Sequence, residues 1–181
     1  MLLFFATWAR LRESSGGSAM RFIIGAAAAW LAASAAQAQS IRAEAATVVD
    51  YGTYAVEDSS VTTDEQGVKQ HYHDNVSLIE RTNTVPLRLG VTFGFRYMLS
   101  GTTNSSSPIR QITIYPSGGL VAPVKSRIDS VEQDTTVQIG DTGLIDYTLD
   151  DPWELVPGVW TLEVRAGDKL LASESFTLVA Q

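Results

Sequence analysis

The stretch VPLRLGVTFGFRYML, residues 85–99, decides the fold class of this chain. Every odd position in it is apolar, and every even position except Met98 carries a proline, a glycine or a polar side chain. This alternation places the apolar side chains on one face of an extended chain, which a helix cannot do. A single strand of this length would span about 45 Å. We therefore expect a bend or break near Gly90, where the chain could change sheets.

The C-terminal end of the chain carries a second clear strand signal. Residues 159–165 alternate, residues 166–169 contain a glycine and an aspartate, and residues 170–179 return as another apolar stretch. This order predicts a β-hairpin, since glycine supplies the positive φ that a tight turn needs. Glu174 would share the apolar face of its strand, so we expect a bulge or an edge position near it.

Weaker strand signals fill the remaining chain, at residues 45–54, 76–81, 109–115, 124–131, 135–139 and 144–149. Residues 56–75 are acidic, polar and rich in turn formers, and we interpret them as a long loop. About seven short strands with regular turn signals are typical of an antiparallel β-sandwich of immunoglobulin-like type. The predicted fold class is therefore all-β, with a signal-peptide helix in front of the sandwich.

The N-terminal residues have the three parts of a secretory signal peptide. Arg21 supplies the positive charge, residues 22–33 form an uncharged apolar stretch, and small residues occupy both recognition positions of Ala36-Gln37-Ala38. We expect cleavage between Ala38 and Gln39. A retained membrane anchor is the alternative, but the uncharged run of 17 residues is short and mostly alanine.

Met20 directly precedes the positive charge of this signal, which predicts that residues 1–19 are a start-site extension and residues 20–38 the signal peptide. Residues 39–181 would then form a single β-sandwich domain, located in the bacterial periplasm or secreted. Cleavage removes one acidic and three basic residues from a chain of net charge −7, which leaves −9. Such an acidic domain repels nucleic acids and anionic membrane surfaces. The absence of cysteine means that packing alone stabilises it.

Several short motifs follow one another in a recognisable order: FGFRY (93–97), IYP (114–116), Tyr147, PWELVPGVWTLE (152–163), KLL (169–171) and SF (175–176). This succession resembles the bacterial family catalogued as domain of unknown function 3859, over roughly residues 45–180, and residues 152–163 are its most specific part. The resemblance implies a compact β-rich domain with no assigned activity, so no functional residues are carried over. A typical member has histidine-proline where this chain has Tyr115-Pro116, and any role of that histidine is absent here.

The two histidines of the chain form a candidate metal site. On an extended segment His71 and His73 point to the same side, and Asp74 is a neighbouring carboxylate. Two imidazoles and a carboxylate are ligands that zinc or copper accepts. A third ligand is not evident from the spacing, so a solvated polar segment is the competing interpretation, and we expect no cofactor.

Catalytic motifs have little support in the sequence. The chain lacks cysteine and a Gly-x-Ser-x-Gly motif, and the adjacent carboxylates of Asp150 and Asp151 precede a proline, where aspartates ordinarily form turns. Neighbouring residues on a strand also point apart, which does not suit a glycosidase pair. We therefore predict that the protein is not an enzyme.

Aromatic residues are the remaining candidates for ligand contacts. Trp153 and Tyr115 could stack on sugar rings if they are exposed, whereas Trp160, Phe176 and Tyr97 fall on apolar faces and are expected in the core. Trp153 could instead fold back over the end of the sandwich. The leading hypothesis is a non-catalytic interaction module of the cell envelope that meets a protein through a sheet edge or the acidic segment. A carbohydrate-binding module and a metal-binding protein are the alternatives, so the expected partner is an envelope protein or a glycan.

Overall fold

The computed structural model describes residues 42–123 and 127–180. The expected start-site extension, the signal peptide and the cleavage site at Ala38–Gln39 lie outside these residues. None of the helices in the described part of the chain has the length and apolar character that a membrane span requires.

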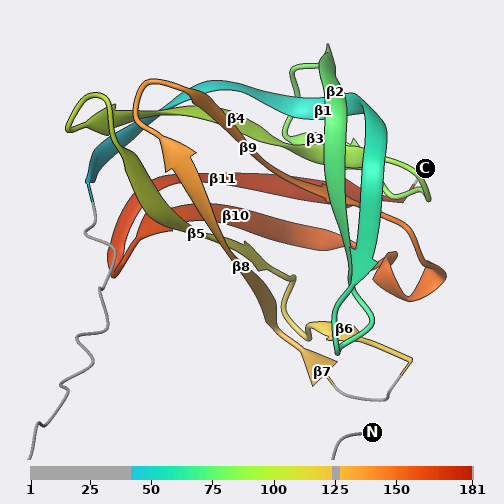
Figure 1. The fold of residues 1–181 in the computed structure, drawn as a ribbon. Coiled ribbons are helices and arrows are strands. Elements are labelled where there is room, and N and C mark those ends of the chain that lie inside the picture. Colours follow the sequence, from blue (N-terminus) through green and yellow to red (C-terminus); the bar gives the residue numbers. More distant parts are fainter. Residues whose placement is uncertain (1–41, 124–126, 181) are drawn as a thin grey trace, which may run out of the picture. The chain divides into compact units, whose positions relative to one another are not determined.

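Two β-sheets face each other and form a sandwich (Figure 1). The first sheet has the strand order β2 (Lys69–Glu80), β1 (Ala43–Thr63), β4 (Thr92–Gly101) and β9 (Thr142–Thr148). The second has the order β3 (Thr84–Pro86), β11 (Lys169–Val179), β10 (Gly158–Ala166), β5 (Ser106–Ile114) and β8 (Ser130–Gln138). A small third sheet pairs β6 (Leu120–Val121) with β7 (Arg127–Ile128), and a 3-10 turn, η1, spans Pro152–Glu154.

The all-β sandwich predicted from the alternation is confirmed, and every strand pair except β3–β11 is antiparallel. The described residues form eleven strands, which is more than the seven or so that the sequence predicts. The difference comes from short segments such as β3, β6 and β7, which carry too few residues for a periodic signal. The strands expected at 124–131 and 135–139 are divided differently, because β7 covers Arg127–Ile128 and β8 runs from Ser130 to Gln138 through the polar residues that were expected to separate them. Residues 124–126 lie outside the described part of the chain.

The expected break near Gly90 is confirmed. Val85 lies on β3, which pairs with β11 in the five-stranded sheet, and Phe93 lies on β4 in the four-stranded sheet. Between them Gly90 has a φ of +77°, a conformation that side chains other than glycine rarely adopt. The single alternating stretch therefore supplies core residues to both sheets.

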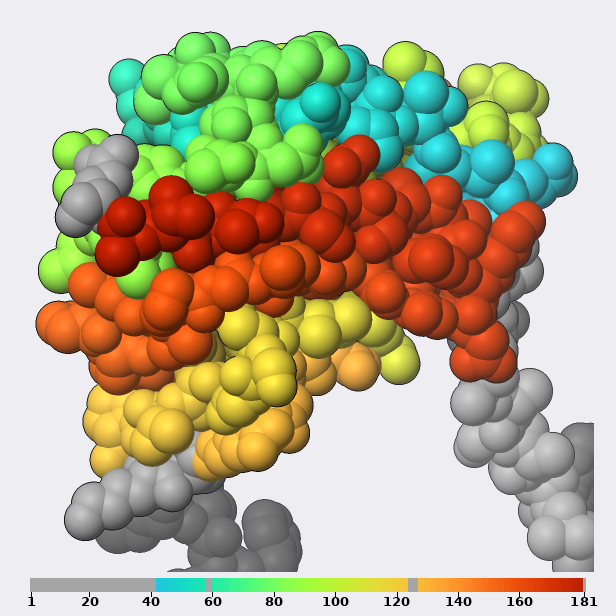
Figure 2. Space-filling view, turned by 180° about the vertical axis from the view of Figure 1, so that it is seen from behind, coloured from blue at the N-terminus to red at the C-terminus, as the bar shows by residue number. Residues whose placement is uncertain are grey.

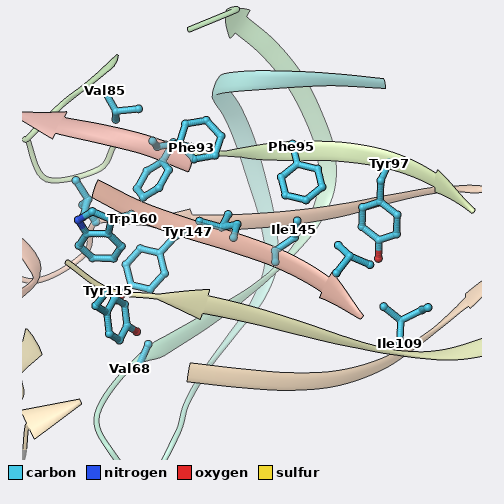
Figure 3. Close-up of a cluster of buried hydrophobic side chains, with 14 of the residues drawn as sticks. Val68, Val85, Phe93, Phe95, Tyr97, Ile109, Tyr115, Ile145, Tyr147 and Trp160 are labelled. Atoms are coloured by element: carbon cyan, nitrogen blue, oxygen red, sulfur yellow. The ribbon is translucent and has the colours of Figure 1, made fainter. Parts of the chain in front are cut away.

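Large apolar side chains from the two sheets interlock in the core. Phe93, Phe95 and Tyr97 point inward from β4, and Trp160 meets them from β10 (Figure 3). Phe176 of β11 packs against Phe93, with ring centroids 5.3 Å apart. The Phe93 and Trp160 rings form an edge-to-face pair with centroids 5.8 Å apart. Burying each such side chain stabilises the fold by about 1.5–3 kcal/mol. The assignment of Trp160, Phe176 and Tyr97 to the core is confirmed.

The acidic segment 56–75, expected as a loop, is instead the outer part of a long hairpin. β1 runs on to Thr63 and β2 begins at Lys69, so that only a short turn separates them. Asp64 Oδ1 closes this turn by accepting hydrogen bonds from the backbone N–H groups of Gln66, at 2.8 Å, and Val68, at 2.9 Å. Register shifts near Asp58 interrupt the pairing of the two strands. These irregularities and the solvent-exposed polar side chains remove the alternation that would have revealed the strands.

The C-terminal hairpin is confirmed as β10 and β11. The register shift of this hairpin falls at Leu171, which has no partner on β10, and β3 pairs only with Thr177 to Val179. Glu174 lies three residues from this bulge and on the part of β11 that β3 does not reach, which is the edge position expected for it.

The two sides of the sandwich differ. On one side β11 lies directly against β1 (Figure 2). There Lys169 Nζ donates a hydrogen bond of 2.6 Å to the Glu44 carbonyl. On the opposite side the edge strands are β8 and β9, which do not pair with each other. The outer part of the β1–β2 hairpin crosses this open side (Figure 1). We call residues 60–73 of this hairpin the strap.

Candidate binding cleft

A cleft of about 400 Å³ lies on the open side of the sandwich, between β8, β9 and the strap. Its walls combine aliphatic side chains with amides and hydroxyls, among them Val131, Gln133 and Thr135 from β8, Gln111 from β5, and His73 from the strap. A volume of this size falls in the range of small-molecule and side-chain pockets. The lining therefore offers both apolar contacts and hydrogen-bonding groups to a ligand.

β8 forms one wall of the cleft because its side chains alternate. Val131, Gln133, Thr135 and Val137 are half-buried and line the cleft, whereas the even-numbered residues between them are exposed on the outer face, apart from the half-buried Ser130 at the start of the strand. The pairing of β8 with β5 is regular over its whole length, from Ser106–Gln138 to Ile114–Ser130. No bulge therefore turns the strand away from the opening.

The backbone hydrogen bonds show which groups of β8 face the opening. The Tyr115 N–H donates to the Asp129 carbonyl at 3.0 Å, and the Ile139 N–H donates to the Ser105 carbonyl at 2.8 Å. Both bonds continue the β5–β8 register, so the odd-numbered residues of β8 are bonded to β5. The N–H and C=O groups of the even-numbered residues then point toward the open edge: Ser130, Glu132, Asp134, Thr136 and Gln138.

The edge of β9 is covered differently. The Leu149 N–H donates to the Val91 carbonyl at 3.0 Å, which places the even-numbered backbone groups of β9 on its outer edge. There the Leu144 carbonyl accepts a hydrogen bond of 2.6 Å from Gln111 Nε2, and the same nitrogen donates to Tyr97 Oη at 3.1 Å. A side chain from the opposite sheet therefore caps the β9 edge. In the described part of the chain β8 pairs only with β5.

The strap is held against β9 and the following segment by three polar contacts. His73 Nε2 lies 2.9 Å from Asp146 Oδ2, and His71 Nε2 lies 2.6 Å from Asp150 Oδ2. Lys69 Nζ forms an ion pair of 3.0 Å with Asp151. At the tip, Val68 is only 1% exposed and belongs to the hydrophobic core. The buried Val68 and three polar contacts, two of them from largely buried histidines, thus fasten the hairpin.

The predicted metal ligands are only partly brought together. His71 and His73 share a face, as expected, and their rings stack with centroids 6.0 Å apart. However, each Nε2 contacts a different aspartate, and Asp74 is exposed at the adjacent position of β2, where alternation turns its side chain to the other face. The described residues contain no group of three or more histidine, aspartate or glutamate side chains arranged to hold a metal ion.

A buried carboxylate, not anticipated from the sequence, supports the segment that anchors the strap. Glu154 is 1% exposed and accepts a hydrogen bond of 2.8 Å from Tyr147 Oη. Its other oxygen accepts the N–H groups of Asp150 and Asp151 at 2.7 and 2.8 Å. Burial raises the pKa of Glu154 and outweighs the hydrogen bonds, which lower it. The capping-box spacing from Asp151 to Glu154 is the sequence signal that could have revealed this role.

The two aromatic candidates do not form an exposed stacking platform. Tyr115 is 5% exposed and packs edge-to-face on Trp160, with centroids 4.9 Å apart (Figure 3). Its hydroxyl group is buried and makes no hydrogen bond of normal geometry within the described residues, and burial raises its pKa. Trp153 lies on η1 and packs partly buried against the core, which corresponds to the folded-back position.

Comparisons with known proteins agree with this architecture. The model of the family described as "Domain of unknown function (DUF3859)" matches residues 42–178. The crystal structure of an immunoglobulin-like protein from Pseudomonas aeruginosa is 32% identical, with a TM-score of 0.56, and the match covers 80% of this chain and 99% of that one. The predicted immunoglobulin-like sandwich is thereby confirmed.

Two other solved structures resemble the chain only weakly. An alkylpurine DNA glycosylase from Pseudomonas fluorescens is 14% identical, with a TM-score of 0.34, over 53% of this chain and 27% of that one. A β-glucosidase from Bifidobacterium adolescentis is 11% identical, with a TM-score of 0.29, over 70% of this chain and 17% of that one. These likenesses carry no functional argument. None of the curated proteins matches the chain.

Proposed function

The chain belongs to the DUF3859 family, and on that premise we propose that it is a non-catalytic binding module of the bacterial cell envelope. The open cleft between β8, β9 and the strap carries this proposal. Half of its wall residues are valine, threonine and glutamine, which pack and form hydrogen bonds. The two histidines in the wall each contact an aspartate and help to hold the strap. Recognition of a ligand is the chemistry that such walls favour.

Export to the envelope is the second part of the proposal. It is supported by the positive charge, apolar stretch and small-residue cleavage site of residues 20–38. The full chain, expressed in a bacterial host with a C-terminal tag, should appear in the periplasmic or secreted fraction with Gln39 as its first residue. Recovery from the cytoplasm with Met1 or Met20 at the N-terminus would refute export.

Binding in the cleft can be tested with a photo-reactive phenylalanine analogue. Thr135 faces the cleft and Thr136, the next residue on the same strand, faces outward. After irradiation of cells, the analogue in place of Thr135 should cross-link to an envelope component, while the same analogue in place of Thr136 should not. Equal cross-linking at the two positions, or none at Thr135, would contradict the proposal. The pair controls for expression and for the chemistry of the probe.

A further inference from the structure

We infer that the open edge of β8 binds an extended, positively charged peptide segment, which adds to the five-stranded sheet as a further strand. This inference rests on the proposed function and names the ligand class of the same cleft. Strand addition at a sheet edge is a common mode of peptide recognition, in which main-chain hydrogen bonds supply affinity and alternate side chains supply specificity.

The backbone of β8 has the geometry that pairing with a further strand requires. Five of its residues point their N–H and C=O groups toward the opening, as the β5–β8 hydrogen bonds establish. The strand contains no proline and no bulge over Ser130–Gln138. Proteins ordinarily protect a long, regular edge with one of these devices, with charged side chains or with a covering segment, and of these β8 has the charged side chains of Glu132 and Asp134. Gln111 covers the neighbouring edge at Leu144, whereas the described residues provide no equivalent for β8.

The cleft would select the side chains of the added strand. Residues of the peptide that face inward would enter the space beside Gln133 and Thr135, with Val131 and Val137 at the two ends. Because several inward-facing residues of the peptide would share a cleft of about 400 Å³, small or β-branched side chains such as valine, threonine and serine fit these positions best. Alternate positions of the peptide would face solvent.

Charge decides what the solvent-facing positions should carry. Glu132 and Asp134 stand on the outer face of β8 with side chains 52% and 77% exposed, and Arg110 contacts both. The single arginine leaves a net negative charge along this part of the edge. Opposite charges across a strand pair stabilise it and like charges destabilise it. A second copy of this acidic chain would bring its own Glu132 and Asp134 to the edge, so a cationic segment is the favoured occupant.

The test uses acetylated and amidated nine-residue peptides in which lysine alternates with valine, threonine or serine, compared with a matched panel in which glutamate replaces lysine. Fluorescence anisotropy should show saturable binding of lysine peptides and about tenfold weaker binding, or none, for the glutamate panel. Thr136→Pro removes an edge-facing N–H without touching the ladder to β5, and should weaken binding by about tenfold. Thr136→Ala keeps the N–H and should bind within about twofold of the wild type.

Peptide N-methylation provides a measurement that does not depend on a protein variant. Methylation of the amides that face β8 should abolish binding while the side chains stay unchanged. No saturable binding of any lysine peptide, or binding insensitive to N-methylation, would overturn the inference. A dimer of the protein in sedimentation that Thr136→Pro dissociates would overturn it in favour of a second copy. If cross-linking from position 135 persists in the Thr136→Pro variant, a ligand binds in the cleft but not by strand addition, so only the inference is refuted. If position 135 gives no cross-link when Thr136 is unchanged, the proposed function itself is refuted.

Discussion

The Nε2 atom of His71 lies 2.6 Å from Oδ2 of Asp150, although 79 residues separate the two in the sequence. This contact joins the strap, in which His71 lines the cleft, to the segment that leads into η1. Both side chains are largely buried, with exposed fractions of 10% for His71 and 17% for Asp150.

Loss of the His71 side chain should loosen the strap. Replacement by alanine leaves Asp150 without this contact, and we expect His71→Ala to lower the free energy of unfolding by about 1–2 kcal/mol. Hydrogen–deuterium exchange should increase in residues 64–73 before it increases in β4 or β10. Ser77→Ala, an exposed change on the same strand, is the control and should leave exchange unchanged. Unaltered protection of the strap in His71→Ala would show that the contact does not fasten it.

Because of Asp50, the free energy of unfolding should depend on pH in the acid range. Hydrogen bonds from Arg96 hold its pKa below the usual range, and Tyr54 Oη adds a further hydrogen bond of 2.8 Å. A carboxylate with a lowered folded-state pKa stabilises the fold above its unfolded pKa of about 3.9 and loses that contribution as the pH falls through the folded-state value.

Asp50→Asn should therefore be less stable than the wild type at pH 6, and the difference should shrink as the pH falls below about 4. Urea unfolding at several pH values measures this difference. The exposed Asp74→Asn is the matched control and should follow the wild type at each pH. A difference between Asp50→Asn and the wild type that stays constant from pH 6 to the acid limit would contradict the assignment.

The two buried tyrosines next to Trp160 should respond in opposite directions to loss of the hydroxyl group. Tyr115 Oη is buried and makes no hydrogen bond of normal geometry within the described residues, so Tyr115→Phe should stabilise the protein by about 1 kcal/mol. Tyr147 Oη donates to the buried Glu154, so Tyr147→Phe should destabilise it by about 1–2 kcal/mol. Thermal unfolding of both variants gives the comparison. Equal effects of the two substitutions would mean that the hydroxyl groups have equivalent surroundings.

Gly94 should not accept even a methyl group. A Cβ atom at this position would lie 2.1 Å from the Ile145 carbonyl oxygen and 2.7 Å from the Asp146 Cα on β9. Because backbone atoms cannot move aside as a side chain can, Gly94→Ala should displace β9 and cost about 2–3 kcal/mol of stability. Met98→Ala changes an exposed residue on the same strand and should cost much less. Denaturant unfolding distinguishes the two, and similar midpoints would show that β9 adapts without strain.

Much of the fold was predictable because the core strands carry regular alternation. Residues 85–99 revealed the sandwich and its change of sheet, and residues 159–179 revealed the C-terminal hairpin. The strap was missed because its side chains are mostly polar and its register shifts near Asp58 destroy the period. The metal hypothesis rested on His71 and His73 sharing a face, which is a local property of a strand. Their partners, Asp146 and Asp150, come from distant residues and carry no local signal.

The amino-acid sequence by itself determined the class of fold, the position of the sheet change at Gly90 and the identity of the main core residues. These follow from side-chain alternation and backbone preference, which act over a few neighbouring residues. Only the tertiary structure decided that β8 keeps an open edge while Gln111 caps the edge of β9. It also decided that Tyr115 is buried and that Glu154 supports the strap anchor. Such features depend on which strands become neighbours, and that is set by the packing of segments far apart in the chain.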